Sequence, residues 1–262
     1  MTKTILITGA TDGIGLLTAT NLAAEGHKVL LHGRSAAKLE KAQAQVGGGS
    51  EIYRADLLRM SDVRAMAADI SKAHSQLDVI INNAGVLKLG NPKTPDGYDA
   101  RFMVNTFAPY VLTRDLLPIV PAEGRIVNLS SAAQAPVDLD ALHGRRQLDD
   151  MSAYAQSKLA ITIWSQEMAK ELVGGPVVVA VNPGSLLASK MVKEGFGIAG
   201  NDLQIGASVL RKAALGESFA TASGKYFDND SGQFAQPNGA ALDAGHSAGV
   251  MQAINEVCAK LS

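Results

Sequence analysis

The sequence has 262 residues, of which 47% are hydrophobic and 19% charged, and its formal net charge at pH 7 is −1. This balance is typical of a globular protein with a large core, and it gives no electrostatic argument for a nucleic-acid or membrane partner. The single cysteine, Cys258, excludes an internal disulfide and a cysteine-based zinc cluster.

Strand-like and helical patterns alternate from the first residues onward. The chain opens on "TKTILITGA" without a leader-like segment, and no apolar run reaches the ~18 residues of a membrane span, so we expect a cytoplasmic protein. Apolar, β-branched runs predict strands at Thr4–Thr8, Lys28–His32, Glu51–Arg54, Val79–Asn82, Arg125–Leu129, Val177–Asn182 and Gly224–Phe227. Helices are expected at Gly13–Glu25, Ala36–Val46, Ser61–His74, Tyr98–Leu117, Ser152–Val173, Leu203–Ala214 and Ser247–Leu261. Strands that are separated by helices predict one α/β domain over residues 1–262. We expect it to be Rossmann-like and doubly wound, with a seven-stranded, mostly parallel sheet and helices on both faces.

Two segments do not follow this alternation. Ala132–Met151 lies between a strand and a long helix, and it predicts either a short helix or a surface flap. Ser185–Asn201 is a glycine-punctuated apolar stretch after a strand, and a long loop of this kind is often a lid over a binding site.

A glycine-rich turn joins the first strand to the first helix. In "ILITGATDGIGLLTA", Gly9, Gly13 and Gly15 follow the spacing G-x-x-x-G-x-G. Glycines at this junction permit a tight turn and let the backbone approach a pyrophosphate at the helix N-terminus. A plain strand-to-helix turn remains the alternative interpretation.

The end of the second strand predicts the cofactor. A carboxylate there would bind a ribose hydroxyl and select NAD, whereas an arginine accommodates a 2′-phosphate. The sequence reads "LLHGRSAAKLE", with Arg34 and Ser35 and no acid. We therefore expect NADP(H) to be preferred, with NAD(H) possible. Asp12, inside the glycine-rich turn, argues mildly against phosphate binding.

Further motifs follow in a fixed order. They are "NNAG" at 82–85, Asn105, "RIVNLSS" ending in Ser130 and Ser131, Tyr154 four residues before Lys158, and "VNPG" at 181–184. Residues four apart on a helix are neighbours, so the phenol and the ammonium share one face. With the glycine pattern, this set resembles the short-chain dehydrogenase/reductase family from about Thr4 to Gly184. "TPDGYDARFMVNTFAPYVLTRDLLP" and the long spacing from Ser131 to Tyr154 are similar to its retinol-dehydrogenase-like branch.

The resemblance implies a catalytic set of Asn105, Ser131, Tyr154 and Lys158. A carbonyl that accepts a hydride needs a proton donor and hydrogen bonds at its oxygen. Tyr154 would be the acid or base, Ser131 would hold the oxygen, and Asn105 would steady a water chain beyond Lys158. Lys158 would bind the nicotinamide ribose, and we expect it to lower the pKa of Tyr154.

The candidate cofactor-binding residues come from the glycine-rich turn, the strand ends and the resemblance together. They are Gly9, Thr11, Asp12, Gly13, Ile14, Gly15, Arg34, Ser35, Asp56, Leu57, Asn83, Ala84, Gly85, Tyr154, Lys158, Pro183, Gly184 and Ser185.

Other residues give weaker signals. His27, His32, His74, His143 and His246 have no metal-ligand spacing, so we expect no metal and predict surface or packing roles, with only His143 near substrate. The helix at 152–173 is apolar nearly all round, which favours a homo-dimer or homo-tetramer unless Ala132–Met151 covers it.

The predicted activity is hydride transfer between NADP(H) and a ketone, an aldehyde or a secondary alcohol. An apolar substrate is suggested by residues expected to frame the pocket, namely Leu87, Leu89, Leu186, Leu187, Met191, Val192, Phe196 and Ile198. Two alternatives remain open, a non-catalytic NADP(H)-sensing protein on the same fold and a methyltransferase on a similar sheet. The first would be expected to lack Tyr154 or Lys158, and the second to carry an acid in place of Arg34.

Overall fold

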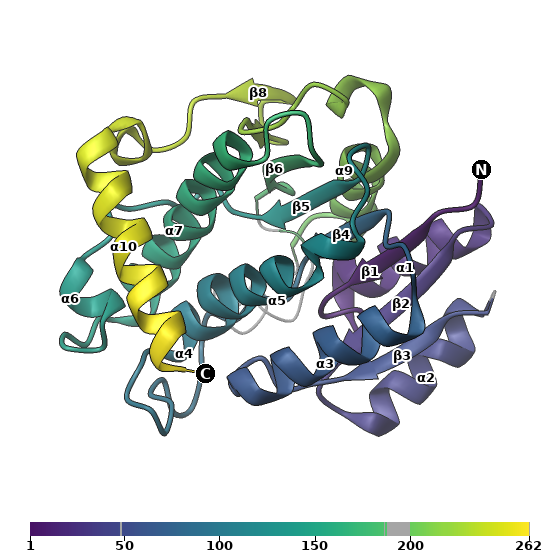
Figure 1. Cartoon of the computed structure of the whole chain (residues 1–262), viewed down its shortest axis with the longest axis horizontal. Helices are drawn as coiled ribbons and strands as arrows, with labels where there is room; N and C mark the ends of the chain where they lie inside the picture. Colours follow the sequence, from purple (N-terminus) through teal and green to yellow (C-terminus); the bar gives the residue numbers. More distant parts are fainter. Residues whose placement is uncertain (48, 186, 188–199, 262) are drawn as a thin grey trace.

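One sheet of eight strands runs through the molecule in the order β3-β2-β1-β4-β5-β6-β7-β8 (Figure 1). The computed structural model describes residues 1–47, 49–185, 187 and 200–261. The strands are β1 (Thr4–Ile7), β2 (Lys28–Gly33), β3 (Glu51–Arg54), β4 (Val79–Asn82), β5 (Arg125–Leu129), β6 (Val177–Asn182), β7 (Tyr226–Asp228) and β8 (Gln233–Ala235). All neighbouring strands are parallel except the antiparallel pair β7 and β8. The fold is therefore Rossmann-like, as the sequence predicts.

The predicted number of seven strands was wrong. The additional strand, β8, has only three residues and lies at the sheet edge, where it pairs with β7 after a short turn. Its sequence, "QFA" between glycine and proline, is too short to show an alternating pattern. Strand β7 also begins two residues later than expected, at Tyr226.

Helices cover both faces of the sheet. They are α1 (Gly13–Ala24), α2 (Ala36–Val46), α3 (Met60–Ala73), α4 (Ala100–Phe102), α5 (Ala108–Leu116), α6 (Leu139–Leu142), α7 (Asp150–Glu171), α9 (Leu203–Leu215) and α10 (Ala244–Lys260). Side chains alternate along each strand, so Leu6 joins the core under α3, α5 and α7 while Ile5 and Ile7 join the core under α1, α2 and α9. Strands β1, β2, β4, β5 and β6 are largely apolar because each contributes buried residues to both cores.

The helix expected at Tyr98–Leu117 is divided into separate elements. A π-helical turn, η1 (Met103–Phe107), separates α4 from α5, and a short 3₁₀ helix, η2 (Leu117–Ile119), follows α5. Pro109 lies in the first turn of α5 and has no N–H, so it cannot donate to the carbonyl of Asn105 four residues earlier. This explains why the α-helical pattern breaks next to Asn105.

The long helix α7 is buried by its own chain. Helix α10 packs across it, and Trp164 on α7 is fully buried (Figure 1). Segment Ala132–Met151 contains the short helix α6, one of the two alternatives left open, and α6 also packs on α10. The apolar positions that suggested a dimer are thus covered within one chain.

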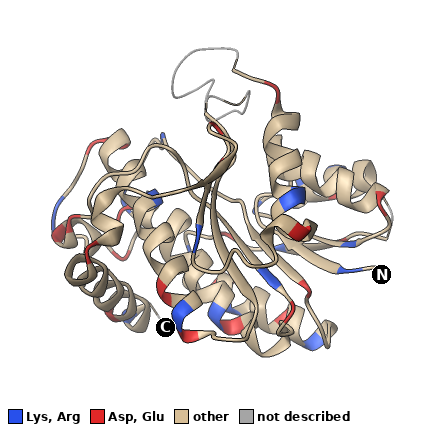
Figure 2. Ribbon diagram, turned by 90° about the horizontal axis from the view of Figure 1, so that it is seen from above, with Lys and Arg blue, Asp and Glu red and all other residues tan. Residues whose placement is uncertain are grey.

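The strand order changes direction between β1 and β4. Strands β2 and β3 follow on the far side of β1, and β5 to β8 follow on the far side of β4. At such a switch point the loops after the strands diverge and leave a crevice for a ligand. In the view of Figure 2, lysine and arginine are interspersed with aspartate and glutamate along the ribbon. None of the described helices combines the length and apolar character needed to cross a membrane.

Candidate active site

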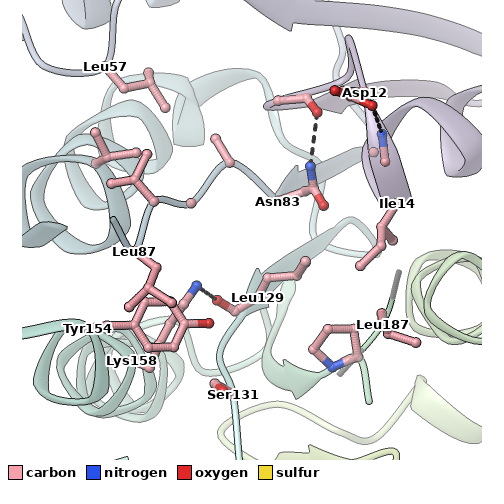
Figure 3. A pocket seen from close by; sticks show the side chains of 18 of the residues that line it. Asp12, Ile14, Leu57, Asn83, Leu87, Leu129, Ser131, Tyr154, Lys158 and Leu187 are labelled. Carbon is pink, nitrogen blue, oxygen red and sulfur yellow. Dashed lines mark hydrogen bonds between the residues drawn. The ribbon is translucent and has the colours of Figure 1, made fainter. Parts of the chain in front are cut away.

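A cavity of about 860 Å³ lies at the carboxyl ends of the parallel strands, at the crevice beside β1 and β4. Figure 3 shows Asp12 and Ile14 at one end of it, named the nucleotide end after its expected role, and Tyr154, Lys158 and Ser131 together at the other, named the chemical end. Every residue predicted to bind a cofactor lines this cavity, as do three of the four predicted catalytic residues. The exception is Asn105.

The glycine-rich turn packs against the "NNAG" segment. Gly9 has a φ of +67°, and a Cβ on Gly15 would lie 2.4 Å from the Gly9 carbonyl oxygen and 2.5 Å from Nδ2 of Asn83. Only glycine fits these two positions. Asn83 holds the turn through hydrogen bonds from its Nδ2 to the carbonyl oxygens of Thr8, at 2.8 Å, and Gly9, at 3.2 Å.

The carboxylate of Asp12 turns back onto its own helix. It accepts a hydrogen bond from the Gly13 N–H at 2.8 Å and so caps α1. A capping carboxylate is stabilised by the positive end of the helix dipole. Asp12 therefore has a structural role in addition to lining the nucleotide end of the cavity.

His32 has a role that the sequence did not indicate. It is 3% exposed, its Nδ1 accepts a hydrogen bond from the Gly9 N–H at 3.1 Å, and its Nε2 lies 3.1 Å from the Ala55 carbonyl oxygen. Burial lowers the pKa of His32 to about 4, so the ring is neutral and Nε2 carries the proton it donates. The prediction of an ordinary packing histidine was incomplete, because this ring joins the glycine-rich turn to the end of β3.

The loop after β2 provides the positive charge at the nucleotide end. Arg34 is exposed and lines the cavity together with Ser35 and Lys38. The Ser35 hydroxyl caps α2 by accepting from the Lys38 N–H at 3.4 Å. No carboxylate lies among these residues, in agreement with the sequence, although Asp56 lines the cavity after β3.

At the chemical end, Tyr154 and Lys158 extend from the same face of α7. The Lys158 ammonium lies 5.6 Å from the centre of the Tyr154 ring and donates to the Leu129 carbonyl oxygen at 2.7 Å (Figure 3). Burial raises the pKa of the Tyr154 phenol, and a hydrogen bond with Ser131 opposes that rise. Burial also lowers the pKa of Lys158 to about 8. The expected lowering of the Tyr154 pKa is not present, because loss of water around the phenol dominates.

The two neighbouring serines have different partners. Ser130 is 3% exposed, and its hydroxyl bonds to the Lys158 carbonyl oxygen at 2.9 Å and to Thr162 at 2.7 Å. Ser131 is the serine that reaches the Tyr154 phenol. Its hydroxyl also accepts from the Ala133 N–H at 3.1 Å. Ser131 is therefore the serine next to the phenol, whereas Ser130 connects the end of β5 to α7.

Asn105 acts on the backbone around the site and does not line the cavity. It is fully buried in η1, and its side chain exchanges two hydrogen bonds with the Val86 backbone, at 2.9 and 3.0 Å. Its Nδ2 also donates to the Ser157 hydroxyl at 3.0 Å. Asn105 thus connects the loop after β4 to the turn of α7 that carries Lys158.

The comparisons with known proteins agree with this geometry. Residues 3–196 match the family model described as short chain dehydrogenase. The chain belongs to the short-chain dehydrogenase/reductase family. It is 33% identical to human retinol dehydrogenase 13 over 86% of this chain and 76% of that protein, and 33% identical to bovine (Bos taurus) retinol dehydrogenase 12 over 87% and 78%. These similarities place it in the retinol-dehydrogenase-like branch, as the sequence predicts.

Solved structures of the short-chain dehydrogenase/reductase family share the fold. A protein of Mycobacterium paratuberculosis aligns with a TM-score of 0.82 and 28% identity over 98% of this chain and 93% of that one. A short-chain dehydrogenase of Burkholderia cenocepacia, solved in complex with NADP, aligns with a TM-score of 0.69 and 27% identity over 86% and 95%. The chain is therefore an oxidoreductase of a family that binds NAD(P).

Several apolar side chains line the cavity of this short-chain dehydrogenase. Of the residues expected to frame a substrate, Leu87, Leu89 and Leu187 line it. Val104, Ala132, Ala133 and Met151 also line it and were not predicted. Leu186, Met191, Val192, Phe196 and Ile198 lie outside the described residues, as does most of the proposed lid at 185–201.

The other histidines lie outside the cavity lining. His143, expected near substrate, pairs with Glu256 on α10, with His143 Nε2 3.6 Å from a carboxylate oxygen, and it does not line the cavity. Among the described residues no group of His, Cys, Asp and Glu could hold a metal ion.

Proposed function

We propose that this chain is an NADP(H)-dependent carbonyl reductase or alcohol dehydrogenase that acts on an apolar ketone, aldehyde or secondary alcohol. One observation carries the proposal: a single cavity is lined by Tyr154, Ser131 and Lys158 and also by Arg34 in the loop after β2.

The nucleotide end fits a phosphorylated dinucleotide. The glycine-rich turn is closely packed at Gly9 and Gly15, and α1 begins there with backbone N–H groups that can bind phosphate. Arg34 and Lys38 supply cations where a 2′-phosphate would lie, and a guanidinium binds phosphate oxygens in pairs. NADPH, when bound, supplies the hydride.

The chemical end fits proton transfer to a carbonyl oxygen. The Tyr154 phenol keeps its proton at neutral pH because burial raises its pKa, and it can give that proton to the oxygen as the carbonyl carbon receives the hydride. The Ser131 hydroxyl, bonded to the same phenol, donates to that oxygen and holds it in place. In the reverse direction the phenolate accepts the proton of an alcohol.

The substrate class is inferred from the lining of the cavity and from the relatives. Leu87, Leu89, Leu187 and Met151 offer apolar contacts within the cavity that Tyr154 lines. The relatives are named retinol dehydrogenases, so an apolar aldehyde such as a retinoid belongs in the first substrate panel.

A non-catalytic NADP(H)-sensing protein is the second candidate. Its cavity would need only the nucleotide end. The described cavity also places Ser131 in a hydrogen bond with Tyr154 and the Lys158 ammonium 5.6 Å from the centre of the Tyr154 ring, which such a protein would not require.

The test is loss of NADPH absorbance with a panel of aliphatic ketones, aromatic aldehydes and all-trans-retinal. Turnover that is abolished by Tyr154→Phe, with NADPH binding retained, supports the enzyme. Tight NADPH binding without turnover of any member, in either direction, favours the sensing protein.

A further inference from the structure

The turn between β7 and β8 contacts the segment that follows β6. Asp228, the last residue of β7, and Asn229 and Asp230 of the turn each make hydrogen bonds to it. The segment is the run Asn182–Ser185, which lines the cavity beside the chemical end. A hairpin far along the chain therefore contacts a wall of the site.

Asp230 makes the most contacts of the three. One carboxylate oxygen accepts from the Ser185 N–H at 2.8 Å, and the other accepts from the Ser185 hydroxyl at 2.5 Å and from Nδ2 of Asn182 at 2.8 Å. Desolvation raises the pKa of Asp230, but the hydrogen bonds from Ser185 and Asn182 outweigh it, so the pKa lies below its usual range. Both oxygens are thus engaged by the two ends of one short segment.

The neighbouring residues fix the middle of the same segment. Nδ2 of Asn182, a side chain only 2% exposed, also donates to Asp228 at 2.8 Å. Nδ2 of Asn229 donates to the Pro183 carbonyl oxygen at 3.0 Å. Gly184 lies between these contacts with a φ of +118°, a conformation that only glycine adopts readily. The Gly184 N–H donates to Oδ1 of Asn182 at 3.3 Å, so every residue from Asn182 to Ser185 takes part in at least one hydrogen bond.

We propose that Asp230 is a positioning residue, which holds Pro183–Ser185 in the conformation that receives the nicotinamide end of the cofactor. This inference rests on the proposed function and on the family resemblance, which implies that Pro183, Gly184 and Ser185 contact the nicotinamide. Asp230 does not line the cavity, so it acts through Ser185 and Asn182. The adenosine end is built by the turns after β1 and β2 and does not depend on it.

The test measures binding of whole NADPH and of 2′-phospho-adenosine-diphosphoribose, a fragment without nicotinamide. For Asp230→Ala we expect the Kd of NADPH to rise by about 10-fold while that of the fragment changes by less than about 2-fold, because hydrogen bonds to charged groups are lost only at the nicotinamide end. Removing a negative charge would by itself strengthen binding of an anionic cofactor, so a weakening has the opposite sign from simple charge repulsion. Asp230→Asn, which keeps one acceptor oxygen, should fall between the wild type and Asp230→Ala.

Asp69→Ala removes the same side chain from the exposed side of α3 and is the matched control; it should change neither Kd. Equal weakening of NADPH and fragment by Asp230→Ala, or no change in either, overturns the positioning role. A wild-type protein that binds neither molecule overturns the proposed function instead, so the two failures are distinguishable.

Discussion

The ammonium of Lys158 donates to the carbonyl oxygen of Leu129 at 2.7 Å, from a side chain that is only 4% exposed. A neutral carbonyl replaces only part of the water that a charged amine loses on burial, and the pKa of Lys158 falls to about 8. The residue that is central to the proposed chemistry is therefore a destabilising element of the fold.

Lys158→Met should stabilise the fold while removing activity. Burial lowers the pKa of Lys158 from 10.5 to about 8 on folding. Below pH 8 the buried ammonium therefore destabilises the folded state by about 3 kcal/mol. Methionine avoids that cost but leaves the Leu129 carbonyl without its donor, so we expect a net gain of about 1–2 kcal/mol at neutral pH. Urea unfolding measures it.

The pH dependence of this effect has a definite sign. Between pH 8 and the ordinary lysine value of about 10.4 the unfolded chain binds more protons than the folded one, so wild-type stability rises with pH in this window. The advantage of Lys158→Met should accordingly shrink as the pH rises toward 10. A variant that is less stable than wild type at neutral pH would contradict the account.

Tyr154→Phe should lose most of the turnover without losing the cofactor. The substitution removes only the proton donor, and general acid catalysis contributes about 10²–10⁴-fold to a rate. We expect kcat to fall within that range, with the Kd of NADPH changed by less than about 2-fold because phenylalanine fills the same space. Tyr53→Phe on β3, outside the cavity lining, is the control. Wild-type kcat in Tyr154→Phe would rule out the acid role.

The lowered pKa of buried His32 predicts that the folded state loses stability in mild acid. Its pKa is about 4 when folded and 6.5 as the reference value, so between these values the unfolded chain binds the additional proton and stability falls as the pH falls. The integrated loss from pH 6.5 to pH 4 is about 3 kcal/mol.

The measurement compares urea midpoints of wild type and His32→Gln across this window. Glutamine does not titrate, so the pH slope assigned to position 32 should disappear, although the variant starts from a lower stability. His27→Gln, at a half-buried histidine outside the cavity lining, should leave the slope unchanged. An unchanged slope in His32→Gln would mean that other groups cause it.

How much of this site could be predicted from the sequence depends on whether local motifs encode it. The glycine-rich turn, "NNAG" and the spacing from Tyr154 to Lys158 each fix a local geometry, so they indicated the cavity and its two ends. The contacts of Asp230 with Ser185 and of His32 with Gly9 join segments that are distant in the sequence. No local pattern specifies such contacts, because they depend on how the strands are ordered in the sheet.

The same reasoning explains the errors in the fold. The π-helical turn around Asn105 follows from Pro109, which removes a backbone donor in the preceding turn, whereas the apolar pattern of Tyr98–Leu117 predicts one continuous helix. Strand β8 exists because β7 offers it an edge, which its own three residues do not reveal. The packing of α10 on α7 is likewise a tertiary contact that no local pattern specifies. It accounts for the apolar surface of α7 without a partner subunit.

Cofactor choice provides the last prediction, because it depends mainly on Arg34. The exposed guanidinium lines the nucleotide end beside Ser35 and Lys38, whereas the nearest carboxylate of the glycine-rich turn, Asp12, is engaged in capping α1. We expect a higher kcat/KM with NADPH than with NADH. Arg34→Asp should remove or reverse the preference, with a loss of about 1.5–3 kcal/mol from the charged hydrogen bonds and a further loss from repulsion. Arg54→Asp, at the end of β3 but not in the cavity lining, is a control for net charge and should keep the preference. Measured against one ketone, equal or better efficiency with NADH in the wild type would show that Arg34 does not select the phosphate.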